Sequence, residues 1–188
     1  MIQSQLDLSK PFIQTIEELL TVEECCEWIN KIKAAGTDFA PINTSDGIKI
    51  DSDVRNNERV IFDDTELADK LYKKVRSFAP EQIHDRQIVG VNERIRCYEY
   101  QIGQRFAPHS DGAFIRNDSE QSFYTFMIYL NDDFEGGETA FLVEPEKIIK
   151  PRTGMGLLFQ HPIIHEGCEV KKGEKFVVRT DLMYKKPV

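Results

Sequence analysis

The sequence predicts an α+β protein: a double-stranded β-helix, or jelly-roll, with N-terminal helices packed on one of its sheets. Two observations predict this fold class. Apolar residues recur at helical spacing only in the first part of the chain, and from Glu93 onward short apolar runs alternate with turn signals. The 188 residues suffice for one domain with its own core. We therefore expect a single domain, with helical support over about 1–92 and a jelly-roll over about 93–186.

Two helices are expected in the first part of the chain. Thr21 to Glu24 has the pattern of a capping box, apolar residues follow at helical spacing, and Gly36 is a plausible end. A second helix is expected to begin near Asp63 and Asp64 and to end before Pro80. The polar stretch 37–53 between them predicts a long loop or a loose hairpin, and a loop of this length suits a lid.

The strands are expected after these helices. The predicted strands are Glu93–Gln101, Gln121–Asn131, Glu138–Leu142, Gly154–Gln160, a short run within Ile163–Val170, and Glu174–Tyr184. Several of them are apolar on both faces, which indicates a sheet covered on both sides. The segment Arg55–Arg59 also opens a predicted strand; it suits either substrate recognition or an ordinary edge strand.

Composition excludes some partners. The formal net charge is −8 and there is no Lys/Arg run, which argues against nucleic acid or an anionic membrane as the main partner. No apolar stretch approaches the roughly 18 residues of a membrane span. The four cysteines lack a C-x-x-C spacing, and we expect reduced thiols in a cytoplasmic protein. The sequence does not determine the oligomeric state.

Histidine and aspartate spacing predicts a metal site. His109 and Asp111 alternate on an extended segment, so both side chains can reach one point. A third ligand from a distant strand would complete a two-histidine, one-carboxylate set, which is typical of non-haem Fe(II) oxygenases. Of the other histidines, His84 is expected at the surface and His161 in a loop at the rim of the site.

Several spaced segments resemble one family. His165 is followed by Gly167, Val170 and Gly173, and a basic residue, Lys175, lies ten positions after it. The segment from Tyr100 to His109 and the turn from Tyr129 to Thr139 also match the motif spacing of the same family. Over about 94–184 the chain resembles the prolyl 4-hydroxylase-like branch of the 2-oxoglutarate/Fe(II) dioxygenases.

The resemblance implies the cofactors and the residues that hold them. Fe(II) would be bound by His109, Asp111 and His165, with 2-oxoglutarate and O2 as co-substrates and ascorbate as a reductant. The far carboxylate of 2-oxoglutarate enters a buried pocket and needs a cation and hydrogen-bond donors. Candidates for these roles are Lys175, Arg179, Tyr100 and Tyr129. Lys175 is favoured as the main cation, and Arg179 is the alternative because it shares the strand parity of Lys175.

The implied reaction is hydroxylation of an unactivated C–H bond, and the resemblance suggests a prolyl residue in a peptide or protein. The candidates for substrate contacts are Arg96, Asn131, Asn57 and Arg179. Three alternatives remain: hydroxylation of a free amino acid or another small molecule, a non-catalytic jelly-roll module that binds a metal or ligand, and a cupin-type metal sandwich that uses no 2-oxo acid.

Overall fold

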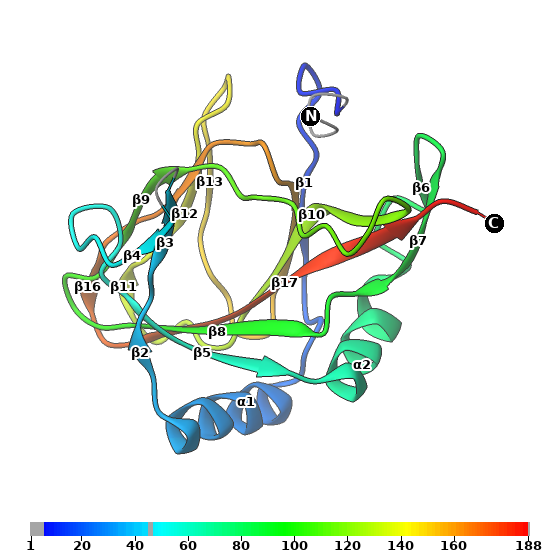
Figure 1. The fold of residues 1–188 in the computed structure, drawn as a ribbon. Helices are drawn as coiled ribbons and strands as arrows, with labels where there is room; N and C mark the ends of the chain where they lie inside the picture. The colour runs from blue at the N-terminus through cyan, green and yellow to red at the C-terminus, as the bar shows by residue number, and fades with distance from the viewer. Residues whose placement is uncertain (1–5, 45–46, 188) are drawn as a thin grey trace.

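The computed structural model describes residues 6–44 and 47–187. The architecture is mostly β, with two helices, as expected for a jelly-roll (Figure 1). The large sheet has the order β1-β14-β10-β17-β8-β5-β2, and β7 continues it along the second half of β17, with β6 on β7. Its strands are β1 (Ile13–Ile16), β2 (Asp38–Phe39), β5 (Glu58–Asp63), β6 (Gln82–Ile83), β7 (Arg86–Val91), β8 (Arg94–Tyr100), β10 (Glu120–Tyr129), β14 (Gly156–Gln160) and β17 (Lys175–Lys185).

A smaller sheet faces part of the large one. Its order is β13-β12-β15-β9, with β9 (Phe106–His109), β12 (Thr139–Phe141), β13 (Lys147–Ile149) and β15 (His165–Gly167). Two short pairs complete the β structure: β11 (Glu135–Gly136) with β16 (Val170–Lys172), and β3 (Ile42–Thr44) with β4 (Gly47–Lys49). None of the helices in the described ranges is long and apolar enough to cross a membrane.

The large sheet is buried on both faces, and strand parity decides which residue faces which layer. On β17, Phe176 and Val178 pack with residues of both helices, whereas Val177 packs between the two sheets. The inter-sheet layer contains Tyr98, Tyr129, Phe141 and Phe159. The apolar character of both strand faces, read from the sequence, thus reflects two separate cores on either side of one sheet.

Both helices begin at the predicted caps. Helix α1 (Val22–Ala35) starts after Thr21, whose hydroxyl accepts from the Glu24 amide while the Glu24 carboxylate accepts from the Thr21 amide, and Gly36 at φ 74° follows its end. Helix α2 (Thr65–Val75) is capped by Asp64. The two helices lie on the same side of the large sheet (Figure 1). Their buried residues, including Trp28 and Leu71, join one cluster with residues of that sheet.

The first half of the chain is more than helical support, and the sequence reading was incomplete here. Strands β1, β5 and β7 all lie before residue 92 and pair with β14, β8 and β17. The reading of Arg55–Arg59 as an ordinary edge strand is also wrong, because β5 lies between β8 and β2. These strands are short and partly exposed, so their apolar alternation is weak in sequence. The predicted loop 37–53 contains β2 and the β3–β4 hairpin, but residues 45–46 lie outside the described residues, and its role as a lid stays a prediction.

A glycine next to helix α1 offers a test of this packing. Gly154 has φ +77°, and a Cβ built on it would overlap the carbonyl oxygen of Leu20. We expect Gly154→Ala to lower the free energy of unfolding by about 2 kcal/mol or more, because it adds backbone strain to a steric overlap. Gly90→Ala is the matched control, since its Cβ would meet no atom within 4 Å, and it should change stability by less than about 1 kcal/mol. Denaturant unfolding measures both, and equal effects would contradict the prediction.

Candidate metal centre

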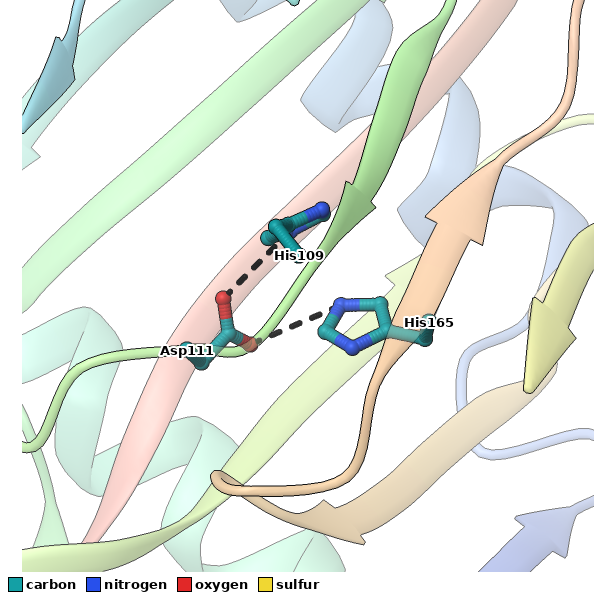
Figure 2. A group of neighbouring side chains, drawn as sticks. All are labelled: His109, Asp111 and His165. Atoms are coloured by element: carbon teal, nitrogen blue, oxygen red, sulfur yellow. Dashed lines mark ion pairs between the residues drawn. The ribbon is translucent and has the colours of Figure 1, made fainter. Parts of the chain in front are cut away.

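Pairing of β9 with β15 brings the two predicted histidine ligands together. His109 at the end of β9 and His165 at the start of β15 are direct cross-strand partners. Asp111 follows β9, and its amide donates to the carbonyl of His161 at 2.9 Å. The His109 Nε2 atom lies 3.7 Å from one Asp111 oxygen, and the His165 Nε2 atom lies 3.8 Å from the other (Figure 2). One donor atom from each of these three residues lies within 4.8 Å of the others, close enough to hold one ion.

Each imidazole is fixed in the tautomer that a metal ligand needs. His109 Nδ1 lies 2.8 Å from the Ala107 carbonyl, and His165 Nδ1 lies 2.9 Å from the Ile163 carbonyl. Each Nδ1–H therefore donates to backbone, which leaves the Nε2 lone pair toward Asp111. Stacking of His109 on Phe106, with ring centroids 3.5 Å apart, further restrains the ring.

The charge states of the triad suit a divalent cation. Burial lowers the pKa of His109 to about 3, and burial also lowers the pKa of His165. Burial alone would raise the pKa of Asp111, but the Arg179 guanidinium and the neighbouring imidazoles outweigh it and hold that pKa well below its usual range. At neutral pH the site thus offers two neutral imidazoles and one carboxylate.

A buried chain of hydrogen bonds orients the carboxylate. The Thr125 hydroxyl donates to Asp111 Oδ2 at 2.5 Å, and Thr125 in turn contacts His161 Nδ1 at 2.9 Å. The other nitrogen of His161 lies 2.8 Å from the Ser122 hydroxyl, whose oxygen accepts from the Phe114 amide. Since Thr125 donates to the carboxylate, its oxygen accepts from His161 Nδ1–H, and Ser122 donates to Nε2. His161 lies in the turn after β14, as expected for a loop residue, but the expectation that it lies at the rim is wrong, because it is fully buried.

Lys175 lies behind the triad in a small pocket. The pocket is lined by Tyr98, Tyr100, Phe106, His109, Met127, Thr139, His165, Gly167, Lys175 and Arg179. Lys175 is 2 % exposed, and its ammonium donates to the Gly137 carbonyl at 2.7 Å. No carboxylate of the described residues pairs with it, and burial lowers its pKa to about 8. A buried cation with an incomplete set of partners is suited to receive an anion.

Comparison with known proteins shows which family the chain is similar to. The family model described as the 2OG-Fe(II) oxygenase superfamily matches residues 94–180, a range that includes the triad and Lys175. The matched range is 87 of the 188 residues, so a little under half of the chain is similar to this superfamily. It is 28 % identical to prolyl 4-hydroxylase 1 of Arabidopsis thaliana over 88 % of this chain and 66 % of that protein. The chain spans about two thirds of the length of the curated relatives it matches.

Solved structures of prolyl hydroxylases have the same fold. The viral collagen prolyl hydroxylase of Paramecium Bursaria Chlorella virus-1, solved with 2OG, aligns with a TM-score of 0.70 at 26 % identity, over 96 % of this chain and 99 % of that one. A Trichoplax adhaerens prolyl hydroxylase bound to a hypoxia inducible factor peptide fragment aligns with a TM-score of 0.71 at 15 % identity, over 98 % and 89 % of the two chains.

The residues present fit both Fe(II) and 2-oxoglutarate, the cofactors named in the description of the matching family. His109, Asp111 and His165 form the two-histidine, one-carboxylate set that is typical of non-haem Fe(II) sites, and they would hold the ion. Lys175 would hold the far carboxylate of 2-oxoglutarate. The use of ascorbate as a reductant stays a prediction.

The two tyrosines predicted to border the co-substrate differ in their surroundings. Tyr100 lines the pocket, and its ring centroid lies 4.9 Å from the Lys175 ammonium. Tyr129 is fully buried, and its hydroxyl lies 2.7 Å from the Thr139 hydroxyl, which itself belongs to a pocket-lining residue. Tyr100 therefore borders the space for a co-substrate directly, whereas Tyr129 borders it through Thr139.

Arg179 occupies a different position from Lys175. Its Nη2 atom lies 2.8 Å from Asp111 Oδ1 and 4.0 Å from Asp181 Oδ1. Arg179 is thus paired with the carboxylate of the triad, while Lys175 lies deeper without such a partner. This difference supports Lys175 as the main co-substrate cation.

The other predicted substrate residues lie in three different places. Arg96 lines a cleft in front of the triad and pairs with Asp181 at 3.2 Å. Asn57 is fully buried and accepts from Arg55 Nε at 2.7 Å, so it positions a cleft arginine. Asn131 does not line the cleft; its amide bonds to Asp133 and to the Glu174 carbonyl in the turn after β10.

The sequence analysis did not identify Thr125, which holds the Asp111 carboxylate. Its only sequence signal is parity, because it shares a face of β10 with Tyr129. We expect Thr125→Val to weaken Fe(II) binding about 10- to 100-fold, since it keeps the side-chain shape but removes the hydrogen bond to Asp111. Thr15→Val, a change on the partly exposed strand β1, is the control. Fe(II) titration of both variants measures the effect, and equal affinities would contradict it.

Proposed function

We propose that this chain is an Fe(II)- and 2-oxoglutarate-dependent dioxygenase that hydroxylates a prolyl residue in a peptide or protein. The observation that carries the proposal is the position of the triad between two spaces. The small pocket that contains Lys175 lies on one side, and a cleft of about 640 Å³ lies on the other, with His109 lining both. This arrangement suits a co-substrate behind the metal and a larger substrate in front of it.

Each residue has a distinct role in the proposed reaction. His109, Asp111 and His165 hold the metal, and Lys175 binds the far carboxylate of 2-oxoglutarate. When bound, Fe(II) supplies the activation of O2, with one oxygen atom going to succinate, formed with CO2 from 2-oxoglutarate, and the other to the substrate. The chain itself supplies position: Phe106 restrains His109, and Thr125 fixes Asp111.

The similarity to prolyl 4-hydroxylases supports a prolyl substrate, and the open cleft supports a peptide. The prolyl hydroxylase of Trichoplax adhaerens, bound to a peptide fragment, supports the same substrate class. The reaction class and the substrate class are separable, because the first depends on the triad and Lys175 and the second on the cleft.

Succinate formation from 2-oxoglutarate tests both parts. With Fe(II) and 2-oxoglutarate, proline-containing peptides should stimulate succinate release and gain one oxygen atom in the mass spectrum. Stimulation by free L-proline and not by peptides would favour the small-molecule alternative. A protein that binds Fe(II) but forms no succinate with any substrate would contradict the dioxygenase proposal and favour the non-catalytic module. Failure of 2-oxoglutarate to alter the absorption of the bound metal would favour the cupin-type alternative.

A further inference from the structure

The cleft in front of the triad is strongly cationic in an acidic protein. Four arginines line it, Arg55, Arg59, Arg96 and Arg179, and among the described residues that line it the only carboxylate is that of Asp111. The chain as a whole carries a formal net charge of −8. Concentration of arginine in one cleft against this overall charge creates a local positive potential that attracts anions.

Two of the four arginines already have carboxylate partners. Arg96 pairs with Asp181, and Arg179 pairs with Asp111. Arg55 and Arg59 have none within the part of the chain that the structure describes. Burial lowers the pKa of Arg59, and the nearby Arg55 and Arg96 lower it further. The unbalanced positive charge of the cleft therefore resides on Arg55 and Arg59.

Pairing of β5 with β8 positions Arg59, whereas Arg55 precedes β5 and forms an isolated β-bridge with Phe106. Arg59 is the cross-strand partner of Tyr98, and Tyr98 is the partner of Val177 on β17. Arg96 on β8 is the cross-strand partner of Arg179 on β17. Because paired residues share a sheet face, Arg59 and Tyr98 form one row across the sheet and Arg96 and Arg179 form the next.

Arg55 is held rigidly where it can bind an anion. Its guanidinium lies 4.5 Å from the Tyr98 ring centroid and 4.3 Å from that of Phe106, and its Nε donates to Asn57. Arg55 is only 5 % exposed, yet its Nη2 atom has no hydrogen-bond partner. A guanidinium fixed in this way offers its remaining N–H groups to a planar carboxylate at little entropic cost.

Unsatisfied polar atoms gather at the same place. The buried side-chain atoms without a hydrogen-bond partner, over the described residues, are Arg55 Nη2, Tyr98 Oη, Arg179 Nε and Asp181 Oδ1. The first three belong to residues that line the cleft, and the fourth belongs to the partner of Arg96. Buried polar groups are normally paired, so these atoms mark the part of the cleft wall with unused hydrogen-bonding capacity.

We propose that the cleft binds a substrate carboxylate through Arg55 and Arg59, with the Tyr98 hydroxyl as a further donor. This inference rests on the proposed function and specifies its substrate: a peptide with an acidic residue beside the residue that is hydroxylated. Arg179 and Arg96 keep their carboxylate partners and shape the cleft wall between this anion site and the triad.

The test compares two proline-containing peptides that differ by Glu against Gln next to the proline. Their binding is measured without O2 on protein loaded with Fe(II) and 2-oxoglutarate, and their turnover is measured with O2. The wild-type protein should prefer the Glu peptide by about 10-fold or more, the value of a charge-assisted hydrogen bond. Arg59→Gln and Arg55→Lys should each reduce this preference toward one. Arg152→Gln removes an exposed arginine outside the cleft and should leave the preference unchanged.

The outcomes separate this inference from the proposed function. Succinate formation without any Glu preference would overturn the anion site and leave the dioxygenase proposal intact. If no succinate forms but the protein binds the Glu peptide more tightly, and Arg59→Gln removes this preference, the dioxygenase proposal would be overturned and the anion site supported. Free acidic amino acids that bind as tightly as the Glu peptide would support the carboxylate site and overturn the peptide as its source. An Arg59→Gln protein that needs more 2-oxoglutarate but keeps the Glu preference would also overturn the site.

Discussion

Replacement of His109 by alanine should abolish Fe(II) binding at concentrations that saturate the wild-type protein. The variant loses one of the three donor atoms. Residues that only hydrogen-bond to a metal ligand contribute up to about 100-fold to metal affinity, so loss of a ligand itself should cost at least this much. Succinate formation should be lost with the metal. The metal content after dialysis measures the first effect, and succinate release measures the second.

The choice of His109 keeps the test independent of folding. Its side chain is 17 % exposed at the cleft, so alanine there should leave the core intact. Added Fe(II) should raise the melting temperature of the wild-type protein and not that of the variant, because a ligand stabilises only the state that binds it. His84→Asn, at an exposed histidine with φ 53°, is the control, since asparagine tolerates this backbone conformation. Full metal binding by His109→Ala would contradict the site.

Lys175→Met should separate co-substrate binding from stability. Loss of a buried cation from a carboxylate pair costs about 2–5 kcal/mol, which corresponds to a KM for 2-oxoglutarate raised about 30-fold or more. The variant should still fold, because removal of a buried charge without a carboxylate partner offsets the lost bond to the Gly137 carbonyl. Lys172→Met removes an exposed lysine that pairs with Glu135 and is the control. An unchanged KM in Lys175→Met, together with a raised KM in Arg179→Gln, would assign the role to Arg179.

The pKa of Lys175 also predicts a pH dependence. Its pKa is lowered from 10.5 to about 8 by burial, so the free protein loses this charge as pH rises through about 8. A bound carboxylate favours the charged form, so the Kd for 2-oxoglutarate should rise above pH 8 by up to about tenfold per unit. The free energy of unfolding should instead rise with pH over this range. The unfolded lysine holds its proton to a higher pH, so burial of Lys175 destabilises the protein most below pH 8 and progressively less between pH 8 and 10.5. Lys175→Met should remove the first dependence.

Local patterns determined much of the fold. The capping box at Thr21 and the cap at Asp64 depend on residues three apart, so the starts of both helices were predictable. The apolar runs of the later strands predicted a sheet buried on both faces, and the structure confirms two cores. The strands before residue 92 were not predictable as part of this sheet, because their stability comes from distant partners such as β8 and β17.

The sequence by itself determined the donor set: the spacing of His109 and Asp111, and the place of His165 and Lys175 in the family pattern. Only the tertiary structure decided what surrounds it. Strand alternation predicts that the side chains of Lys175 and Arg179 share one face of β17, but it does not predict which of them contacts Asp111. Burial of His161 and the unpaired charges of Arg55 and Arg59 follow likewise from strands far apart in the chain. Electrostatic partners are set by distance in space, and cross-strand pairing creates those distances without leaving a local signal in the sequence.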